Sequence, residues 1–113
     1  MEYNLVIVPP GGGEADFSQK VRGATHVPQT GEYVVIAVED EKDEGMNGAE
    51  AYLVRYAITN LKRQGWETAT NIRTTVEAEP VRHPYQSKRH GDMCDRYDGH
   101  GGHPTKSFPE SGY

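Results

Sequence analysis

The stretch MNGAEAYLVRYAITNLKRQG, residues 46–65, carries the clearest periodic signal in the chain. Its apolar residues recur three and four positions apart, which is the spacing that places side chains on one face of a helix. They are Met46, Ala49, Leu53, Val54, Ala57, Ile58 and Leu61. Lys62 and Arg63 come shortly before Gly65, an order of residues that ends many helices. The stretch therefore predicts an amphipathic helix over residues 46–65.

Strands are predicted on both sides of this helix. YNLVIV, residues 3–8, is a β-branched run that ends at two prolines, and EYVVIAVED, residues 32–40, holds five consecutive apolar residues. Residues 66–79 alternate with a period of two, which predicts a long amphipathic strand. A three-stranded sheet cannot pair such a strand along its whole length, so we expect it to bend, bulge or pair with another chain. Between the first two strands, Phe17 and Val21 predict one or two helical turns.

This order of elements predicts an α+β fold, in which one main helix covers a small three-stranded sheet that a partner can extend. We expect residues 1–79 to form this small α+β domain. Residues 80–113 contain four prolines and five glycines and few aliphatic residues. Such a composition cannot bury enough apolar surface to fold alone, so it predicts an extended or disordered C-terminal tail, irregular and rich in Gly, Pro and His.

The charge of the chain is uneven. Its formal net charge is −5, and residues 1–79 hold seven basic and thirteen acidic residues. An acidic body argues against non-specific binding to nucleic acid, because that binding depends on basic residues that neutralise phosphates. A single cysteine, Cys94, excludes an intrachain disulfide, and the N-terminal apolar run is too short for a membrane span. We expect no membrane contact and a location in the cytoplasm, in a virion or in another intracellular assembly.

The stretch HGDMCDRYDGHGGHP, residues 90–104, concentrates metal-binding residue types. One sulfur and three nitrogens suit tetrahedral zinc, so the candidate ligands are His90, Cys94, His100 and His103. Their spacing matches no zinc-finger or zinc-ribbon pattern, which leaves a flexible polar tail with incidental metal affinity as the other interpretation. The three aspartates of the stretch lack the spacing of a calcium loop. No cofactor is predicted, with zinc as the alternative.

Two groups of basic and aromatic residues are candidates for contact with a partner. The first lies in VRHPYQSKRH, residues 81–90, where such a composition suits either nucleic acid or an acidic protein surface. The second lies off the main apolar stripe of the predicted helix and has the residue types enriched at interfaces. Together the candidates are Arg82, Tyr85, Lys88, Arg89, Tyr52, Arg55 and Tyr56.

Nothing in the sequence predicts catalysis. The glycines after residue 10 lack the Gly-Lys-Ser/Thr ending of a phosphate-binding loop, and the surroundings of Cys94 offer no rigid element to position a base. No pair of groups on a rigid element can serve as acid and base, so we expect no enzyme.

The hypothesis that covers most of the chain is a non-catalytic interaction protein. It would be a small subunit or accessory factor of a larger assembly, such as a phage or viral structural protein or a phage-type inhibitor. It would bind protein partners, or further copies of itself, through its sheet and helix surface and its C-terminal tail. The alternatives are a zinc-stabilised module and an accessory protein that contacts nucleic acid through residues 81–90.

Overall fold

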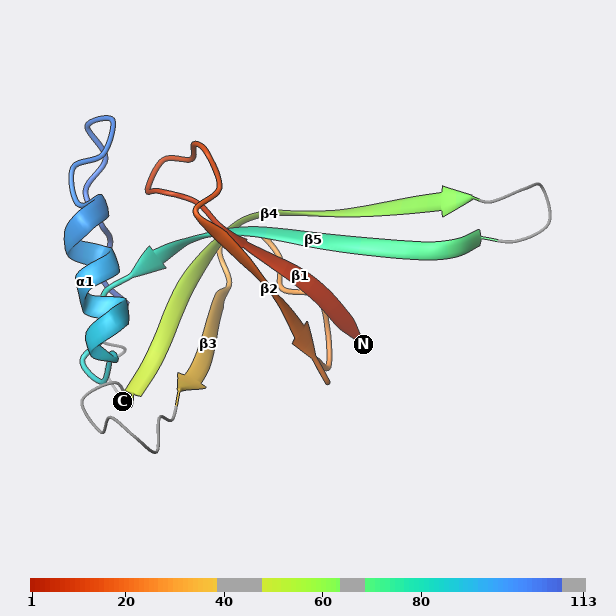
Figure 1. The fold of residues 1–113 in the computed structure, drawn as a ribbon, viewed down its shortest axis with the longest axis horizontal. Helices are drawn as coiled ribbons and strands as arrows, with labels where there is room; N and C mark the ends of the chain where they lie inside the picture. Colours follow the sequence, from red (N-terminus) through yellow and green to blue (C-terminus); the bar gives the residue numbers. More distant parts are fainter. Residues whose placement is uncertain (39–47, 64–68, 109–113) are drawn as a thin grey trace.

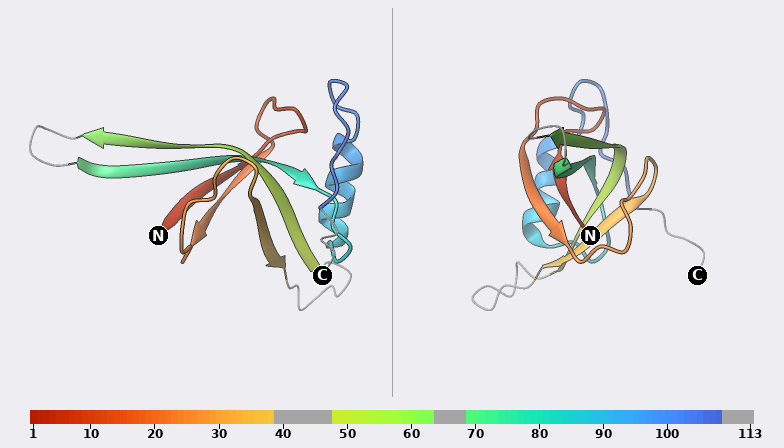
Figure 2. Two further views of the ribbon diagram at one scale, coloured as in Figure 1. Left: turned by 180° about the vertical axis from the view of Figure 1, so that it is seen from behind. Right: turned by 90° about the vertical axis from the view of Figure 1, so that its right-hand side faces the viewer.

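A mixed five-stranded sheet dominates the computed structural model, which describes residues 1–38, 48–63 and 69–108 (Figure 1). The elements are β1 (Glu2–Ile7), β2 (Phe17–Arg22), β3 (Tyr33–Val38), β4 (Gly48–Arg63), β5 (Ala69–Val81) and α1 (Lys88–Tyr97). The strand order is β2-β1-β5-β4-β3, in which β1 and β5 are parallel and the other neighbours are antiparallel. The sheet curls into a half-barrel with α1 at one end (Figure 2).

The predicted fold class is therefore wrong. Residues 48–63 of the predicted helix form β4, and the predicted helical turns around Phe17 and Val21 form β2. The helix of the described part of the chain is α1, which lies in the segment predicted to be irregular. Residues 46–47 and 64–65, the ends of the predicted helix, lie outside the described residues. The described part of the chain is mostly sheet, with five strands instead of three.

A bulge in β4 explains the misleading helical period. Tyr52 and Val54 are buried and obey the two-residue alternation of a strand. The register then shifts, because Val54 pairs with Ala78 while Tyr56 pairs with Glu77, which leaves Arg55 as the extra residue. The next core-facing position of β4 is therefore residue 57 rather than residue 56. Inward positions at 52, 54 and 57 lie two and then three residues apart, which imitates the spacing of a helix face.

Strand β5 finds its full-length partner within the chain. Its register with β4 runs from the pair Ala51 and Val81 to the pair Arg63 and Ala69. Because the predicted helix is in fact a strand of 16 residues, longer than the 13 residues of β5, β5 needs no second chain to pair along its length. Strands at residues 2–7 and 33–38 confirm two of the predicted strands, and β5 confirms most of the third. Residues 66–68 at its predicted start lie outside the described part of the chain.

The core lies on the concave face of the half-barrel, where α1 closes one end. Its buried members are Tyr3, Leu5, Ile7, Val34, Tyr52, Val54, Val76, Ala78 and Met93. Helix α1 begins at Ser87, whose Oγ accepts a hydrogen bond from the His90 backbone N–H at 3.2 Å. Its face toward the sheet buries His90, Met93 and Cys94. The residues after α1 then return along the end of β5, where Phe108 N donates to the Arg82 carbonyl at 2.7 Å.

The predicted division of the chain after residue 79 stays a prediction, although residues on both sides of it contribute to one core. Among the described residues, no helix has the length and apolar character needed to cross a membrane.

Candidate functional site

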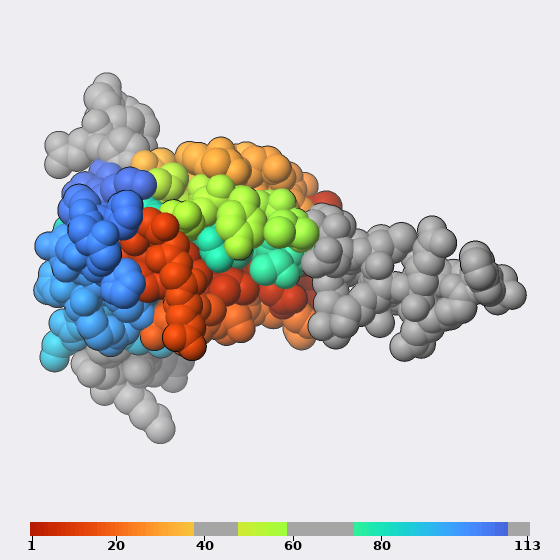
Figure 3. All heavy atoms as spheres, turned by 90° about the horizontal axis from the view of Figure 1, so that it is seen from above, coloured from red at the N-terminus to blue at the C-terminus, as the bar shows by residue number. Residues whose placement is uncertain are grey.

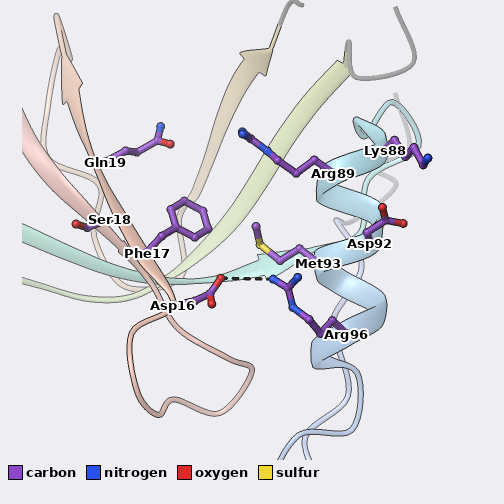
Figure 4. A pocket seen from close by; sticks show the side chains of 9 residues that line it. All are labelled: Asp16, Phe17, Ser18, Gln19, Lys88, Arg89, Asp92, Met93 and Arg96. Carbon is purple, nitrogen blue, oxygen red and sulfur yellow. Dashed lines mark hydrogen bonds and ion pairs between the residues drawn. The ribbon is translucent and has the colours of Figure 1, made fainter. Parts of the chain in front are cut away.

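A groove of about 510 Å³ separates β2 from α1 (Figure 4). From the β2 side it is lined by Asp16, Phe17, Ser18 and Gln19, and from α1 by Lys88, Arg89, Asp92, Met93 and Arg96. Its volume falls in the range of ligand-binding clefts. Strand β2 is an edge strand, and among the described residues it pairs with β1 alone.

The groove lies beside β2, whose outer edge has no strand partner among the described residues. Asp16, just before the strand, and Phe17, Ser18 and Gln19 within it line the cavity. In Figure 4 the Phe17 and Gln19 side chains point toward α1 and the Ser18 side chain points away, as successive residues of a strand do. At the outer edge of such a strand, alternate backbone N–H and C=O groups lack a strand partner. The groove therefore places an edge strand beside a helix.

The middle of the groove is apolar. In Figure 4 the Phe17 ring projects from β2 toward α1, and the Met93 side chain projects from α1 into the same space. Phe17 is half-buried, and Met93 is 5% exposed and belongs to the core. An apolar side chain of a ligand that reached between them would be removed from water. It would contact the Phe17 ring and the Met93 thioether instead.

Arg89 forms one wall of the groove, and the buried carboxylate of Glu50 holds its side chain in place. Its Nε donates to Glu50 Oε1 at 3.0 Å, and its Nη2 donates to the same oxygen. Glu50 is 1% exposed, and its other oxygen accepts a hydrogen bond from the Tyr52 hydroxyl at 2.8 Å. Hydrogen bonding to Glu50 raises the pKa of Arg89, while burial first and Glu50 second raise the pKa of Tyr52. The guanidinium therefore stays charged and positioned.

Arg96 and Lys88 carry the remaining positive charge. Arg96 Nη2 lies 3.5 Å from Asp16 Oδ2, so this ion pair spans the groove, and its guanidinium carbon lies 5.0 Å from the centre of the Tyr97 ring. Lys88 has no hydrogen-bond or ion-pair partner among the described residues. An arginine has five N–H donors, so both guanidinium groups keep donors for a further acceptor. Carboxylates and phosphates are the acceptors whose geometry a guanidinium fork matches.

Two of the seven predicted partner-binding residues, Lys88 and Arg89, line this groove. Tyr85 is 77% exposed on the connection before α1, and Tyr52 is buried in the core. Arg82 is bound to Asp95, 2.7 Å away, on α1.

Arg55 and Tyr56 meet Glu77 at the bulge of β4. Arg55 Nε and the Tyr56 hydroxyl lie 3.2 Å and 2.8 Å from the two oxygens of this carboxylate. The structure therefore places the seven predicted residues in separate parts of the fold, with Tyr52 in the core.

The four predicted zinc ligands do not form one cluster. His90 and Cys94 are buried on α1, whereas His100 and His103 are exposed in the turn after it. His90 Nε2 lies 2.8 Å from the Val81 carbonyl oxygen and 3.4 Å from the Ala51 backbone nitrogen, so this nitrogen faces backbone groups of the sheet. Burial raises the pKa of the Cys94 thiol to about 11. Within the described ranges, no group of three or more His, Cys, Asp or Glu side chains is arranged to hold a metal ion.

A second charged cluster surrounds Glu79, which is 1% exposed on β5. Its carboxylate accepts a hydrogen bond from Gly11 N at 3.1 Å and lies 3.4 Å from Arg55 Nη1 and 2.9 Å from Lys106 Nζ. Figure 3 shows the loop after β1, in red-orange, against the blue segment that follows α1. A Cβ at Gly11 would overlap the His103 ring, so the two segments are closely packed. This cluster joins three parts of the chain and leaves Glu79 covered.

The sequence interpretation missed the β2 side of the groove and most of α1. In FSQKVR, residues 17–22, Phe17 and Val21 lie on one side of a two-residue alternation that places Ser18, Lys20 and Arg22 on the other, which is the period of a half-buried strand. In KRHGDMCDRY, residues 88–97, positions three and four apart share a face. Both patterns are present in the printed sequence, but each covers a short stretch that consists mainly of polar residues.

No protein-family model matches the chain, and no curated protein and no solved structure matches it significantly.

Proposed function

We propose that the chain is a non-catalytic interaction protein that binds an extended segment of a protein partner in the groove between β2 and α1. The observation that supports this most directly is that β2, an edge strand of the described sheet, lines the groove opposite the basic residues of α1. In the proposed assembly the chain is an accessory factor or small subunit, and its role is to hold another protein.

The proposed mode of binding is strand addition. An extended peptide that pairs with an exposed sheet edge gains main-chain hydrogen bonds, and its alternate side chains enter pockets beside the strand. Here the sheet would grow by one strand next to β2, and one set of alternate side chains would face α1. Phe17 and Met93 would contact an apolar side chain of the segment.

The charge of the groove favours a segment that carries carboxylates. Three cationic side chains line the groove against two acidic ones, Asp16 and Asp92, in a chain whose overall charge is −5. Arg89 and Arg96 already have carboxylate partners, so the segment would use their remaining donors. Partner and protein would then associate faster at low ionic strength than at high ionic strength.

The first experiment titrates the full chain with a short, capped peptide that has serine at every second position and valine and aspartate in turn at the positions between, so that both valine and aspartate can face α1. Binding is followed by two-dimensional amide NMR, and the same peptide with lysine in place of aspartate is the control. We expect shifts at residues 16–19 and along α1 with the aspartate peptide alone. Equal binding of both peptides, or shifts elsewhere on the chain, would refute the proposal.

Methylated peptides distinguish strand addition from simple charge attraction. A strand that pairs along one edge uses every second N–H group, so methylation of one alternate set of amide nitrogens should abolish binding while methylation of the other set leaves it intact. If both methylated peptides bind like the parent, no strand is added to β2.

Matched charge reversals locate the binding site. Arg96→Glu should weaken binding of the aspartate peptide by about tenfold, which corresponds to about 1.4 kcal/mol. Arg22→Glu is the control, because Arg22 lies on the same strand outside the groove and its side chain is 77% exposed. Its effect on binding should be less than about twofold, because an exposed charge outside the site interacts weakly. Similar losses in both variants would mean that only net charge matters.

A further inference from the structure

A second hollow, of about 270 Å³, lies beside the end of β2 that is farther from α1. It is lined by Tyr3 of β1, Val21 of β2 and Ala24 just after β2, and by Val34 and Ile36 of β3. Strands β2 and β3 are the two edges of the described sheet, so the curl of the half-barrel brings both edges to this hollow. Strand β2 therefore has the groove beside its first residues and the hollow beside its last ones.

The groove and the hollow lie on the same face of β2. Phe17, Gln19 and Val21 are half-buried and alternate with exposed residues. Their register partners on β1, all of them buried, are Ile7, Leu5 and Tyr3. Residues that pair directly across two antiparallel strands have their side chains on the same face. Phe17 in the groove and Val21 in the hollow therefore both face the core side of the half-barrel.

The hollow offers apolar contact. Tyr3 and Val34 are 5% and 8% exposed and belong to the core, and Val21 and Ile36 pack against it. The charged residues at the hollow already bind each other, because His26 Nε2 lies 3.0 Å from Glu32 Oε2. The hollow is smaller than the clefts that enclose a whole small-molecule ligand, so its volume suits one apolar side chain.

The spacing of the two sites along β2 matches one extended segment. Phe17 and Val21 are four residues apart, which is about 13 Å along a strand. A segment paired with β2 has the same rise, so the side chain beside Phe17 and the one that enters the hollow are also four residues apart. The side chain midway between them lies beside Gln19, whose amide has two N–H donors for a carboxylate. This spacing holds for a parallel and for an antiparallel segment.

We infer that the partner segment has an apolar residue, an acidic residue two positions on and a second apolar residue four positions on, and that this second apolar side chain fills the hollow. The inference rests on the proposed function, because it names the sequence pattern of the segment that is added to β2. The basic residues of α1 favour the acidic residue, and the apolar lining at both ends of β2 favours the two apolar residues. The hollow thus makes the site selective for spacing as well as for charge.

The test compares two capped peptides of the same composition, each flanked by serines, by titration of the full chain and amide NMR. The first has Val-Ser-Asp-Ser-Val at its centre. The second has Val-Ser-Asp-Val-Ser, in which the second valine points to the opposite face of the strand. We expect the first peptide to bind about tenfold more tightly, a difference of about 1.4 kcal/mol. The first peptide alone should shift the amides of Val21, Ala24 and Ile36.

A pair of variants on β2 assigns this preference to the hollow. Val21→Gln removes an apolar side chain from the lining, so the two peptides should then bind this variant within about twofold of each other. Lys20→Gln is the matched control, because Lys20 is the preceding residue on the opposite face and its side chain is 48% exposed. It should keep the preference for the first peptide. Circular dichroism of both variants checks that the strand signal is unchanged.

The outcomes separate this inference from the proposed function. If both peptides shift residues 16–19 and α1 and bind equally, the segment does not use the hollow, and the inference is overturned while the proposed function stands. A preference for the first peptide that Val21→Gln leaves intact would also overturn it, because the second valine would then bind elsewhere. If neither peptide shifts residues 16–19 or α1, the proposed function fails and the inference fails with it.

Discussion

Glu50 on β4 holds Arg89 on α1 across the interface between sheet and helix. The carboxylate is 1% exposed, and Arg89 Nε lies 3.0 Å from its Oε1. A buried carboxylate without a cationic partner would be costly, so this pair fixes where α1 lies against the sheet. The same contact fixes one wall of the groove.

Replacement of Arg89 should therefore affect stability as well as binding. Arg89→Ala leaves the buried Glu50 carboxylate without its cation, and we expect the free energy of unfolding to fall by about 1–3 kcal/mol. Urea denaturation followed by circular dichroism measures this change. Arg22→Ala, which removes an exposed ion pair with Glu2, should cost about 0.5 kcal/mol or less. If both variants lost the same free energy of unfolding, the Glu50–Arg89 pair would contribute no more to stability than an exposed ion pair.

Stability should decrease at mildly acid pH because of His90. Burial lowers the pKa of this side chain, whose Nδ1 has no hydrogen-bond partner among the described residues. The unfolded chain takes up a proton near pH 6.5 while the folded chain keeps His90 neutral, so stability is full above about pH 6.5 and falls as the pH drops toward the folded pKa. Urea midpoints of His90→Gln should show a weaker dependence on pH in this window than those of the wild type. An unchanged dependence would assign it to other groups.

Cys94 should react slowly with thiol reagents in the folded protein. Its side chain is 0% exposed, and burial raises its pKa to about 11, so little of the reactive thiolate exists at neutral pH. Alkylation by iodoacetamide, followed by mass spectrometry, should be at least about a hundredfold slower than in denaturant, because reaction waits for opening of the fold. Labelling at the denatured rate without denaturant would mean that α1 does not stay packed.

The interaction of Lys106 with Glu79 should anchor the segment after α1. Burial acts to raise the pKa of Glu79, but Lys106, the Gly11 N–H group and Arg55 more than offset this and lower it below its ordinary value. The resulting stability is present above the unfolded pKa of about 4.3 and is lost as the pH falls through the folded pKa.

Lys106→Met should therefore destabilise the protein at neutral pH by about 1–3 kcal/mol and by less at acid pH, where Glu79 is protonated in both proteins. Urea denaturation at the two pH values measures this difference. A loss of stability that is the same at both would indicate that Lys106 acts through its packing.

The strands that the sequence predicted correctly are those whose pattern is simple. β1 and β3 are β-branched apolar runs, and β5 alternates without a break over most of its length. In β4, by contrast, the extra residue Arg55 changes the phase of alternation in the middle of the strand. Local spacing then resembles a helix, and only the long-range pairing with β5 shows that the stretch is a strand.

The groove escaped prediction for a related reason. Helix α1 buries His90, Met93 and Cys94, so its inward face lacks the aliphatic residues by which an amphipathic helix is usually recognised. Two of these residue types, histidine and cysteine, are also metal ligands, so the same residues match a metal site as well as the buried face of a helix. The edge position of β2, which gives the groove its other wall, depends on strand order and cannot be read from local sequence.

The bulge at Arg55 also bears on how this protein can change through insertions and deletions. Upstream of it the inward positions of β4 are set by Tyr52 and Val54, and downstream by Ala57. Loss of Arg55 would remove the extra residue and restore uninterrupted alternation, with Tyr52, Val54 and Ala57 still on the core face. The bulge is thus a position at which β4 can lose one residue without turning its core residues outward. A one-residue deletion within the regular pairing on either side would instead move the residues beyond it to the opposite face.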